Sequence, residues 1–444
     1  MLIQYKILLL NRNKLSIFND ILKGSSTTFL ISVLTIISGY LFIYFINKIY
    51  GTAFVGVFTT TQSLFFIISI LCTLGFDTYS LKVFSSNNNI NYLLSVYSVI
   101  IKTTLLLSVV ISFILYFNSN LISFFFNNDL LSHPIKILSL SLIPLVILNI
   151  HSQIFRAFKN MYLHSIYNRK FIIVIMFFLI LILLIFNWDI NSNNIFYLYL
   201  YSMFFLAIIS SLHIDIFLKK KKKENSKQDL VFEKENFSNL YSNSKSMLII
   251  SLVFILFQYI DILLLAFLST DENVGIYTIV LKISSITGIV LMAINSIAGP
   301  IISKLYFNDK LSEFSVYIKK MVRLSFIFSI PILLFIIFFS SLILSFFGEQ
   351  FNNYKYALII MCLAQLINVS SGSVGLIMQM TNNEKIFRNI IVFSMVINFI
   401  LNIILIPKFH VWGAIYSSSF SLVLWNVLGA FFVYKKLKIY SFIH

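Results

Sequence analysis

Charged side chains are scarce in this chain of 444 residues. Only 11% of the residues are Asp, Glu, Lys or Arg, whereas 59% are hydrophobic. A soluble globular domain carries roughly 25% charged residues, so this composition excludes an ordinary water-soluble fold. The apolar residues form long runs, and about 20 apolar residues span a bilayer as a helix. The polar–apolar alternation of a transmembrane barrel is absent. The sequence therefore predicts an all-α, multi-pass membrane protein.

Cysteines are also scarce, and the two present, Cys72 and Cys362, are isolated within apolar runs. This pattern excludes a disulfide framework or a cysteine metal site, and we expect both side chains to serve in packing.

The apolar run at 7–10 is short and is followed by "NRNK" rather than by small residues. We therefore expect no cleaved signal peptide. No cofactor or metal is expected, apart from a coupling ion.

Acidic residues are half as numerous as basic ones, 16 against 33, which gives a net charge of +17. The basic residues lie between the apolar runs, where orientation in a membrane explains them better than nucleic-acid binding does.

Twelve spans are expected, at about 25–47, 53–76, 92–118, 135–156, 171–187, 195–218, 245–268, 274–302, 324–347, 355–379, 388–407 and 412–434. The fifth is the shortest, and the fourth contains Pro144.

The distribution of the basic residues predicts the orientation of these spans. With the N-terminus in the cytoplasm, 27 of the 33 basic residues fall on the cytoplasmic side and four on the outside. The remaining two, Lys102 and Lys282, lie inside spans. This asymmetry indicates a plasma-membrane protein with both termini in the cytoplasm.

Two similar stretches, "VGVFT" at 55–59 and "VGIYT" at 274–278, are separated by 219 residues (275 minus 56). Each glycine begins the second span of a six-span half, where glycine allows a tight turn or a close helix approach. We expect two parallel repeats, the architecture of an alternating-access transporter. They would form an N-terminal lobe at 1–218, a cytoplasmic connector at 219–244 and a C-terminal lobe at 245–444. The Lys-rich connector is a solvated link or a site for anionic lipid head groups.

Five short motifs follow one another along the chain. They are "LKGS" at 22–25, "YGTAFVGVF" at 50–58, "LGFDTYSLKVFS" at 74–85, "YIDILLL" at 259–265 and "NSIAGPIISKLY" at 295–306. They resemble motifs of the Wzx-type polysaccharide flippases of the multidrug/oligosaccharidyl-lipid/polysaccharide exporter superfamily, although Thr52 and Ile262 replace a usual Pro and Arg. The resemblance implies a MATE-like fold and a transporter rather than an enzyme.

The resemblance further implies the transported molecule, a polyprenyl-pyrophosphate-linked oligosaccharide moved from the cytoplasmic to the outer leaflet by alternating access. Such a flippase serves O-antigen or capsule assembly, with membrane lipids and the polysaccharide polymerase machinery as further partners. A multidrug or other lipid exporter of the same superfamily is an alternative, although a drug exporter would need more carboxylates in its cavity. A membrane polymerase or ligase is less favoured, because the longest outer loop, at 119–134, holds only His133 among the expected Arg and His residues.

Cations within or beside the spans are the candidate ligands for the pyrophosphate. A charge near the bilayer centre costs about 2.5–3.5 kcal/mol on insertion. Lys102 and Lys282 bear this cost, so they are the leading candidates for binding the pyrophosphate. The alternative is that their side chains snorkel to the interface. Lys23, Lys82 and Arg156 lie at cytoplasmic span ends, where they could receive the head group or only set the orientation. Arginine suits bidentate phosphate contacts, which favours Arg156 among these three.

Asp261 is the main intramembrane carboxylate. It could bind a coupling ion, H⁺ or Na⁺, or it could form a structural ion pair with a lysine such as Lys282. Asp77, at the inner end of the second span, is expected to cap or to pair locally with Lys82. No single aromatic residue stands out as a sugar ligand, because aromatic side chains on membrane helices usually face lipid or the core.

Overall fold

The computed structural model describes residues 30–442, apart from 88, 187–190, 225–236 and 309–310. Within these residues all regular secondary structure is helical. The first half contains a helix at Leu30–Tyr50 followed by α2 (Thr52–Thr73), α3 (Phe76–Ser86), α4 (Ile90–Phe117), α5 (Ser119–Phe125), η1 (Asp129–Leu131), α6 (Ser132–Ser139), α7 (Leu142–Ala157), α8 (Met161–Ile166), η2 (Arg169–Phe171), α9 (Ile172–Ile185) and α10 (Ser192–Glu224).

The second half contains α11 (Phe237–Leu268), α12 (Asp271–Ser285), η3 (Ile286–Gly288), α13 (Ile289–Phe307), α14 (Leu311–Phe338), α15 (Ser340–Ser345), η4 (Glu349–Tyr354), α16 (Lys355–Ser370), α17 (Val374–Met380), α18 (Glu384–Phe409) and α19 (Val411–Leu437). We use "first half" and "second half" for these two sets of helices.

The number of long apolar helices agrees with a multi-pass membrane protein. Ten helices in the described residues are long and apolar enough to cross a bilayer. An eleventh crossing arises if Asp129–Ser139 and α7, which meet at a bend of 56°, form one broken span. Pro144 lies in the first turn of α7, where its missing N–H is tolerated. The expected fifth span corresponds to α9, which has 14 residues and is shorter than a full crossing.

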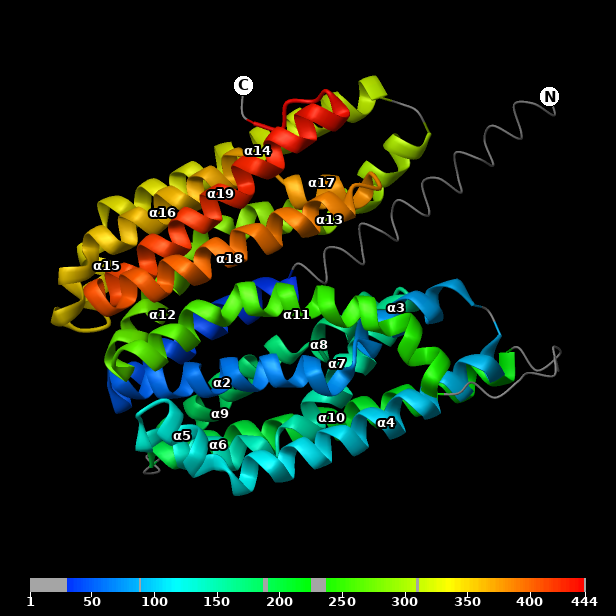
Figure 1. Ribbon diagram of the computed structural model, residues 1–444, viewed down its shortest axis with the longest axis horizontal. Coiled ribbons are helices and arrows are strands. Elements are labelled where there is room, and N and C mark those ends of the chain that lie inside the picture. The colour runs from blue at the N-terminus through cyan, green and yellow to red at the C-terminus, as the bar shows by residue number, and fades with distance from the viewer. Residues whose placement is uncertain (1–29, 88, 187–190, 225–236, 309–310, 443–444) are drawn as a thin grey trace.

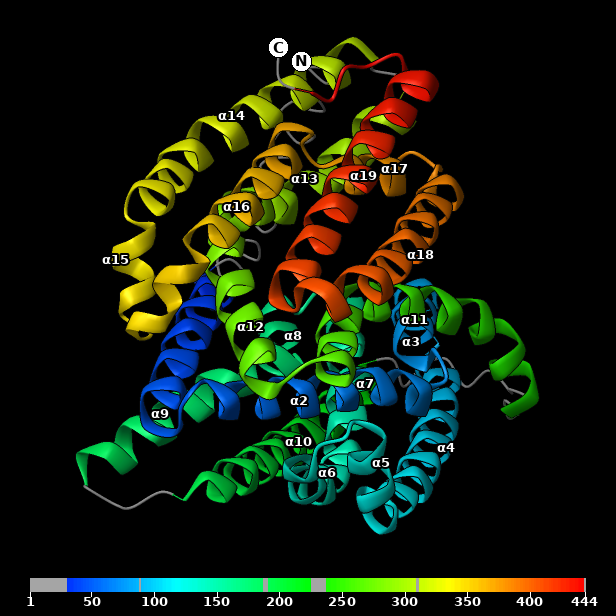
Figure 2. The same cartoon turned by 60° about the vertical axis from the view of Figure 1, so that its left-hand side comes forward.

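The two halves form two groups of helices that touch along α2, α11 and α12 (Figure 1). Figure 2 shows α12 lying across α2, with α14 to α19 on one side and α4, α5, α6 and α10 on the other. Helices α10 and α11 extend from either side into the expected connector, whose residues 225–236 lie outside the described part. The exact division into lobes therefore stays a prediction.

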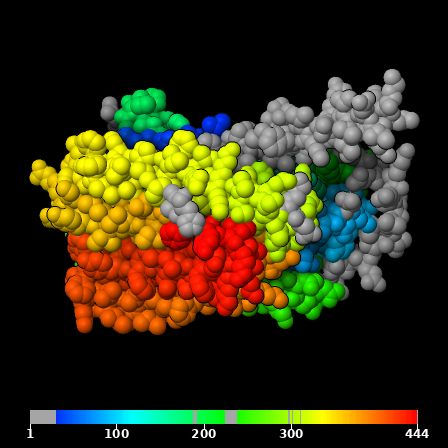
Figure 3. All heavy atoms as spheres, turned by 90° about the horizontal axis from the view of Figure 1, so that it is seen from above, coloured from blue at the N-terminus to red at the C-terminus, as the bar shows by residue number. Residues whose placement is uncertain are grey.

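The outer surface is apolar, as a bilayer-facing surface should be. Helix α14, yellow in Figure 3, lies on the outside of the second half. Its Phe314, Ile318 and Leu333 are buried, whereas Phe328 and Phe338 are exposed. Burial of one helical stripe with large apolar groups on the opposite side is expected for a helix between protein and lipid.

The two repeat glycines lie where the halves cross. A Cβ atom on Gly56 would lie 1.9 Å from the carbonyl oxygen of Asp271, and one on Gly275 would lie 2.1 Å from that of Thr52. Thr52 and Asp271 are themselves 219 residues apart and begin α2 and α12. Each repeat therefore contacts the equivalent part of the other, and the expected close helix approach is confirmed. We call this end of the molecule, where α2 and α12 begin, the crossing end.

Further contacts close the crossing end. The Asn128 side chain donates to both carboxylate oxygens of Asp271 at 2.7 Å. Gln350 donates to the Thr52 hydroxyl at 3.0 Å, and Asn47 donates to the carbonyl of Phe347 at 2.6 Å. These contacts join α2, α12 and the neighbouring loops of both halves.

Candidate substrate and ion sites

Lys282 lies on α12 at the contact between the two halves. A Cβ atom on Gly39, in the helix Leu30–Tyr50, would lie 3.9 Å from the Lys282 Nζ and 3.8 Å from Ile173 of α9. The Tyr40 hydroxyl donates to the backbone carbonyl of Lys282 and lies 3.0 Å from the Ser285 hydroxyl. Helices from both halves therefore surround this intramembrane lysine.

Two further cations approach the same interface from the first half. Arg169 and Lys170 belong to η2, the short helix that leads into α9. The guanidinium carbon of Arg169 lies 4.8 Å from the ring centre of Phe66 on α2, and its charge acts on Tyr259 of α11. The charge of Lys170 acts on Lys282. The fold thus gathers three cations, one from the second half and two from the first, which we call the cation cluster.

Among the described residues, the cation cluster lacks enough negative charge to balance it. Lys170, which has the same sign, is the charged group that acts on Lys282. The carboxylate of Asp77 interacts with the charge of Arg169. Asp77 is buried on α3, whereas Lys82 on the same helix is exposed. Like charges within a membrane protein are costly unless an anion compensates them. The arrangement can therefore bind a group that carries more than one negative charge.

Lys102 lies elsewhere, on the exposed face of α4. Its neighbours on that face, Leu106 and Phe113, are 68% and 60% exposed. The opposite face carries the buried residues Ile100 and Thr104. Lys102 therefore faces away from the packed side of α4, whereas Lys282 lies at the contact between the halves.

Two other predicted cations are exposed at helix positions outside the cluster. Lys82 is exposed on α3, and Arg156 is exposed in the last turn of α7. Lys23 lies outside the described residues. A role for these three side chains in receiving the head group stays a prediction.

Asp261 is buried in the second half and is bound by neutral groups. Asn402 donates to its Oδ1 at 2.5 Å, while Tyr277 and Ser418 donate to its Oδ2 at 3.1 and 2.8 Å. An ion pair with Lys282 is not among these contacts. The Oδ1 of Asn402 is buried without a hydrogen-bond partner in the described residues. A carboxylate beside an unused amide oxygen, at a cavity of about 130 Å³, suits a proton or a hard cation.

Sequence reasoning missed several of these residues. Arg169 and Lys170 are among the basic residues that the charge distribution assigns to the cytoplasmic side, and their local sequence does not distinguish them from the others there. Asn398 and Asn402 are four residues apart within the apolar run at 396–407, so they share one face of α18. Two amides on one face of a membrane helix could have indicated the polar site around Asp261.

Comparison with known families agrees with this architecture. Residues 21–306 match the profile of the family described as "polysaccharide biosynthesis protein", and residues 247–404 match that of the MatE family. The first match covers more than half of the chain.

Two curated proteins of Haloferax volcanii are similar to parts of the chain. The "probable low-salt glycan biosynthesis flippase Agl15" is 26% identical over 212 residues, 47% of this chain and 45% of that protein. The "probable flippase AglR" is 26% identical over 177 residues, 39% of this chain and 37% of that protein. The matched region thus spans less than half the length of these relatives.

Solved structures share the fold at low sequence identity. An inward-facing multidrug MATE transporter matches with a TM-score of 0.69 and 10% identity, covering 91% of this chain and 94% of that one. The lipid II flippase MurJ in an inward closed conformation matches with a TM-score of 0.68 and 17% identity, covering 93% and 87%. The predicted MATE-like fold is confirmed, and the chain belongs to the polysaccharide biosynthesis protein family.

Proposed function

We propose that this protein is a flippase that carries a polyprenyl-pyrophosphate-linked oligosaccharide from the cytoplasmic to the outer leaflet of the plasma membrane. Such transport would serve the assembly of a surface polysaccharide. The observation that carries the proposal is the cation cluster of Lys282, Lys170 and Arg169 at the interface between the halves. The names of the Haloferax relatives and of MurJ support a flippase rather than an enzyme.

The cation cluster addresses the main physical difficulty of this transport. The lipid tail can stay in the bilayer, but the anionic head group must cross about 30 Å of hydrocarbon. Cations from both halves would replace the water and counterions that a pyrophosphate loses on entering the protein. Because the cluster includes groups from both halves, the bound anion would contact each half while they move relative to each other.

The proposed orientation places the crossing end on the outside and both termini in the cytoplasm. The basic residues of the expected cytoplasmic loops support this orientation. Release to the outer leaflet would then require the halves to separate where Gly56 meets Asp271 and Gly275 meets Thr52.

We further propose that Asp261 binds the coupling ion, H⁺ or Na⁺. The neutral donors from Asn402, Tyr277 and Ser418 would hold the carboxylate in place, and the free oxygen of Asn402 would complete a cation site. This site lies wholly in the second half, so ion binding there could change how that half packs against the first.

A multidrug exporter is the second candidate, because the cavity beside Asp261 offers a carboxylate to a cationic drug. The cation cluster favours an anionic substrate instead. The two candidates differ in which lipid accumulates when the protein is lost.

The test uses a gene-deletion strain in which surface polysaccharide and the leaflet location of its lipid-linked precursor are both measured. We expect loss at the surface, with the precursor trapped in the cytoplasmic leaflet. Complementation with Lys282→Ala should reduce export by about tenfold to a hundredfold, since a charge-assisted contact contributes about 1.5–3 kcal/mol. Lys408→Ala, which changes an exposed lysine in the last turn of α18, is the matched control.

Two results would argue against this assignment. Unchanged polysaccharide without a trapped precursor would favour the drug or other lipid exporter. Loss of export in Lys102→Ala with normal export in Lys282→Ala would move the head-group site to α4, as sequence alone allows.

A further inference from the structure

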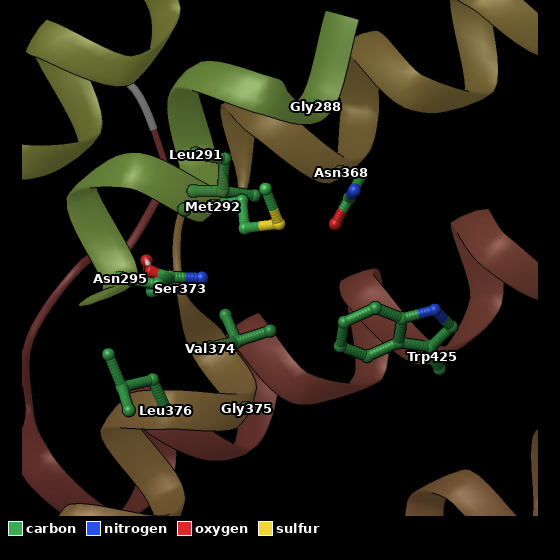
Figure 4. Close-up of a pocket in the computed structure, with 11 residues that line it drawn as sticks. Gly288, Leu291, Met292, Asn295, Asn368, Ser373, Val374, Gly375, Leu376 and Trp425 are labelled. Carbon is green, nitrogen blue, oxygen red and sulfur yellow. Dashed lines mark hydrogen bonds between the residues drawn. The ribbon is translucent and has the colours of Figure 1, made fainter. Parts of the chain in front are cut away.

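The second half contains a cavity of about 310 Å³ that is separate from both sites described above. Figure 4 shows Met292, Asn368, Val374 and Trp425 arranged around one open space, on α13, α16, α17 and α19. The volume is at the lower end of the range for small-molecule sites, about 300–1,000 Å³. None of its lining residues is charged.

Two interrupted helices border this cavity. Helices α12 and α13 are separated by η3, which ends at Gly288, and α16 and α17 are separated at 371–373. Gly372 has a φ of +67°, and a Cβ atom there would lie 2.4 Å from the Val322 side chain, so glycine is needed for this break. Interrupted backbone at membrane depth is tolerated where it lines a cavity, and such breaks are typical of transporter binding sites.

The first half has interruptions at corresponding places. Helices α2 and α3 are separated at 74–75, and α7 and α8 are separated at 158–160. Gly75 and Lys159 have positive φ angles of 76° and 61° at these breaks. The breaks therefore belong to the repeated fold, and the residues that line the cavity belong to the second half.

The cavity offers a specific set of polar groups. The Trp425 Nε1–H is buried and has no hydrogen-bond partner within the described residues. Asn368 donates to Gln365 at 3.0 Å, and Figure 4 shows its side-chain oxygen directed into the open space. A buried donor without a partner costs about 1–3 kcal/mol, which a bound acceptor would recover. Met292 and Val374 add apolar walls beside the donor and the acceptor.

We propose that this cavity binds an N-acetylated hexose of the transported oligosaccharide. The acetamido carbonyl would accept from Trp425 Nε1–H, the acetamido N–H would donate to Asn368, and the methyl group would contact Met292 and Val374. An uncharged lining suits a neutral sugar and disfavours the pyrophosphate or a cationic drug. This inference rests on the proposed flippase function and specifies the sugar that the flippase recognises.

The position of the cavity fits a sugar close to the pyrophosphate. Lys282 and Gly288 are six residues apart on the α12–η3 segment, which is about 9 Å along a helix. A head group held at the cation cluster could therefore place one of its first sugars at the cavity.

The test measures binding of three probes to the purified full-length protein. They are a polyprenyl pyrophosphate, the same carrier bearing one N-acetylglucosamine, and the same carrier bearing one glucose. We expect wild-type protein to prefer the N-acetylglucosamine carrier over the other two. Trp425→Phe keeps an aromatic ring but loses the N–H, so the preference should fall about fivefold. Trp412→Phe, on the same helix but outside the cavity, should keep it.

A second variant tests whether the cavity itself is occupied. A Cβ atom at Gly288 would meet only the Gln365 side-chain oxygen, at 3.7 Å, and Gly288 lines the cavity. We therefore expect Gly288→Leu to fold and to fill part of the space. We expect this variant to lose the preference for N-acetylglucosamine while still binding the bare carrier.

Three outcomes would overturn the inference. If Trp425→Phe and Gly288→Leu both keep the preference, the sugar binds elsewhere. If Gly288→Leu weakens all three probes equally, the cavity holds the polyprenyl chain instead. If wild-type protein binds none of the carriers, the proposed flippase function fails along with this inference.

Discussion

The two halves of the molecule place different chemistry at corresponding positions. Residues 219 positions apart correspond to each other in the two halves. Phe42, Phe58 and Tyr199 of the first half correspond in this way to Asp261, Tyr277 and Ser418 of the second half. In the first half the three aromatic rings pack together, with centroids 5.3 and 5.8 Å apart. In the second half the corresponding side chains form the hydrogen-bonded site around the carboxylate.

The comparison shows which features the repeat preserves and which it changes. The glycines of the crossing end make equivalent contacts in both halves, so the scaffold is symmetric there. The interiors differ: the first half has an apolar core at the positions where the second half has the polar site around Asp261. The first half instead contributes Arg169 and Lys170, whereas Arg388, 219 residues after Arg169, is exposed on α18. The scaffold is shared, but the proposed ion site lies in the second half, whereas the cation cluster takes residues from both halves.

The largest expected effect comes from breaking the symmetric crossing. In Gly56→Ala the new Cβ would meet backbone 1.9 Å away, which no side-chain rotation can relieve. Overpacking of this kind costs about 1–3 kcal/mol, and here it acts against closing the crossing end. We expect export to fall about tenfold or more, and Gly275→Ala to behave alike. Cross-linking of cysteines placed at Thr59 and Thr278 would report the closure.

The control for the glycine variants is Gly299→Ala, whose Cβ would make an ordinary contact of 3.5 Å with Leu376. It should leave both the cross-link and export near the wild-type level. If Gly56→Ala lowers export and Gly275→Ala does not, the crossing is symmetric in geometry but not in function.

The next largest effect concerns the proposed ion site around Asp261 in the second half. Asp261→Asn keeps the shape of the side chain but removes the charge, so it should abolish transport while the carrier still binds. An ion bound at 100 times its Kd stabilises a protein by about 2.7 kcal/mol. We expect Na⁺ or acid pH to raise the Tm of wild-type protein and to leave that of Asp261→Asn unchanged. Phe42→Leu should cost about 1–2 kcal/mol of stability and keep the ion response.

A smaller effect should separate the two corresponding arginines. Arg169→Ala removes one of three cations from the cluster, so we expect about tenfold weaker binding of polyprenyl pyrophosphate. Arg388→Ala removes an exposed arginine whose hydrogen bonds within the described residues go to the Asn389 side chain, at 3.3–3.4 Å, so binding should change less than twofold. Equal losses in both variants would mean that the pyrophosphate interacts through the general positive charge rather than at the cluster.

The sequence predicted the fold better than the site, for a physical reason. Long apolar runs and loop charges determine membrane helices, and the glycine repeat identified the crossing because close helix approach requires a missing side chain. The cation cluster depends on how α8 and η2 turn back before the short α9, which no local pattern specifies. Lys102 and Lys282 look alike in sequence, and only packing shows that one is on the exposed face of α4 and the other at the interface. Likewise, the sequence does not distinguish Trp425 from the other aromatic residues, and only the positions of the two helix breaks show that it lines a cavity.

The smallest expected effect tests the hydrogen bond between the two repeats. The hydroxyls of Thr59 and Thr278 lie 3.2 Å apart, and each comes from the same position of its repeat. Replacing either by valine keeps the shape and removes the bond, which should cost about 1 kcal/mol. Because the two hydroxyls are hydrogen-bonded to each other, the double variant Thr59→Val with Thr278→Val should lose less stability than the two single variants together. A double-mutant cycle of thermal unfolding measures this coupling. Additive losses would show that the hydroxyls act only through their own helices, so that the glycine contacts alone hold the crossing end together.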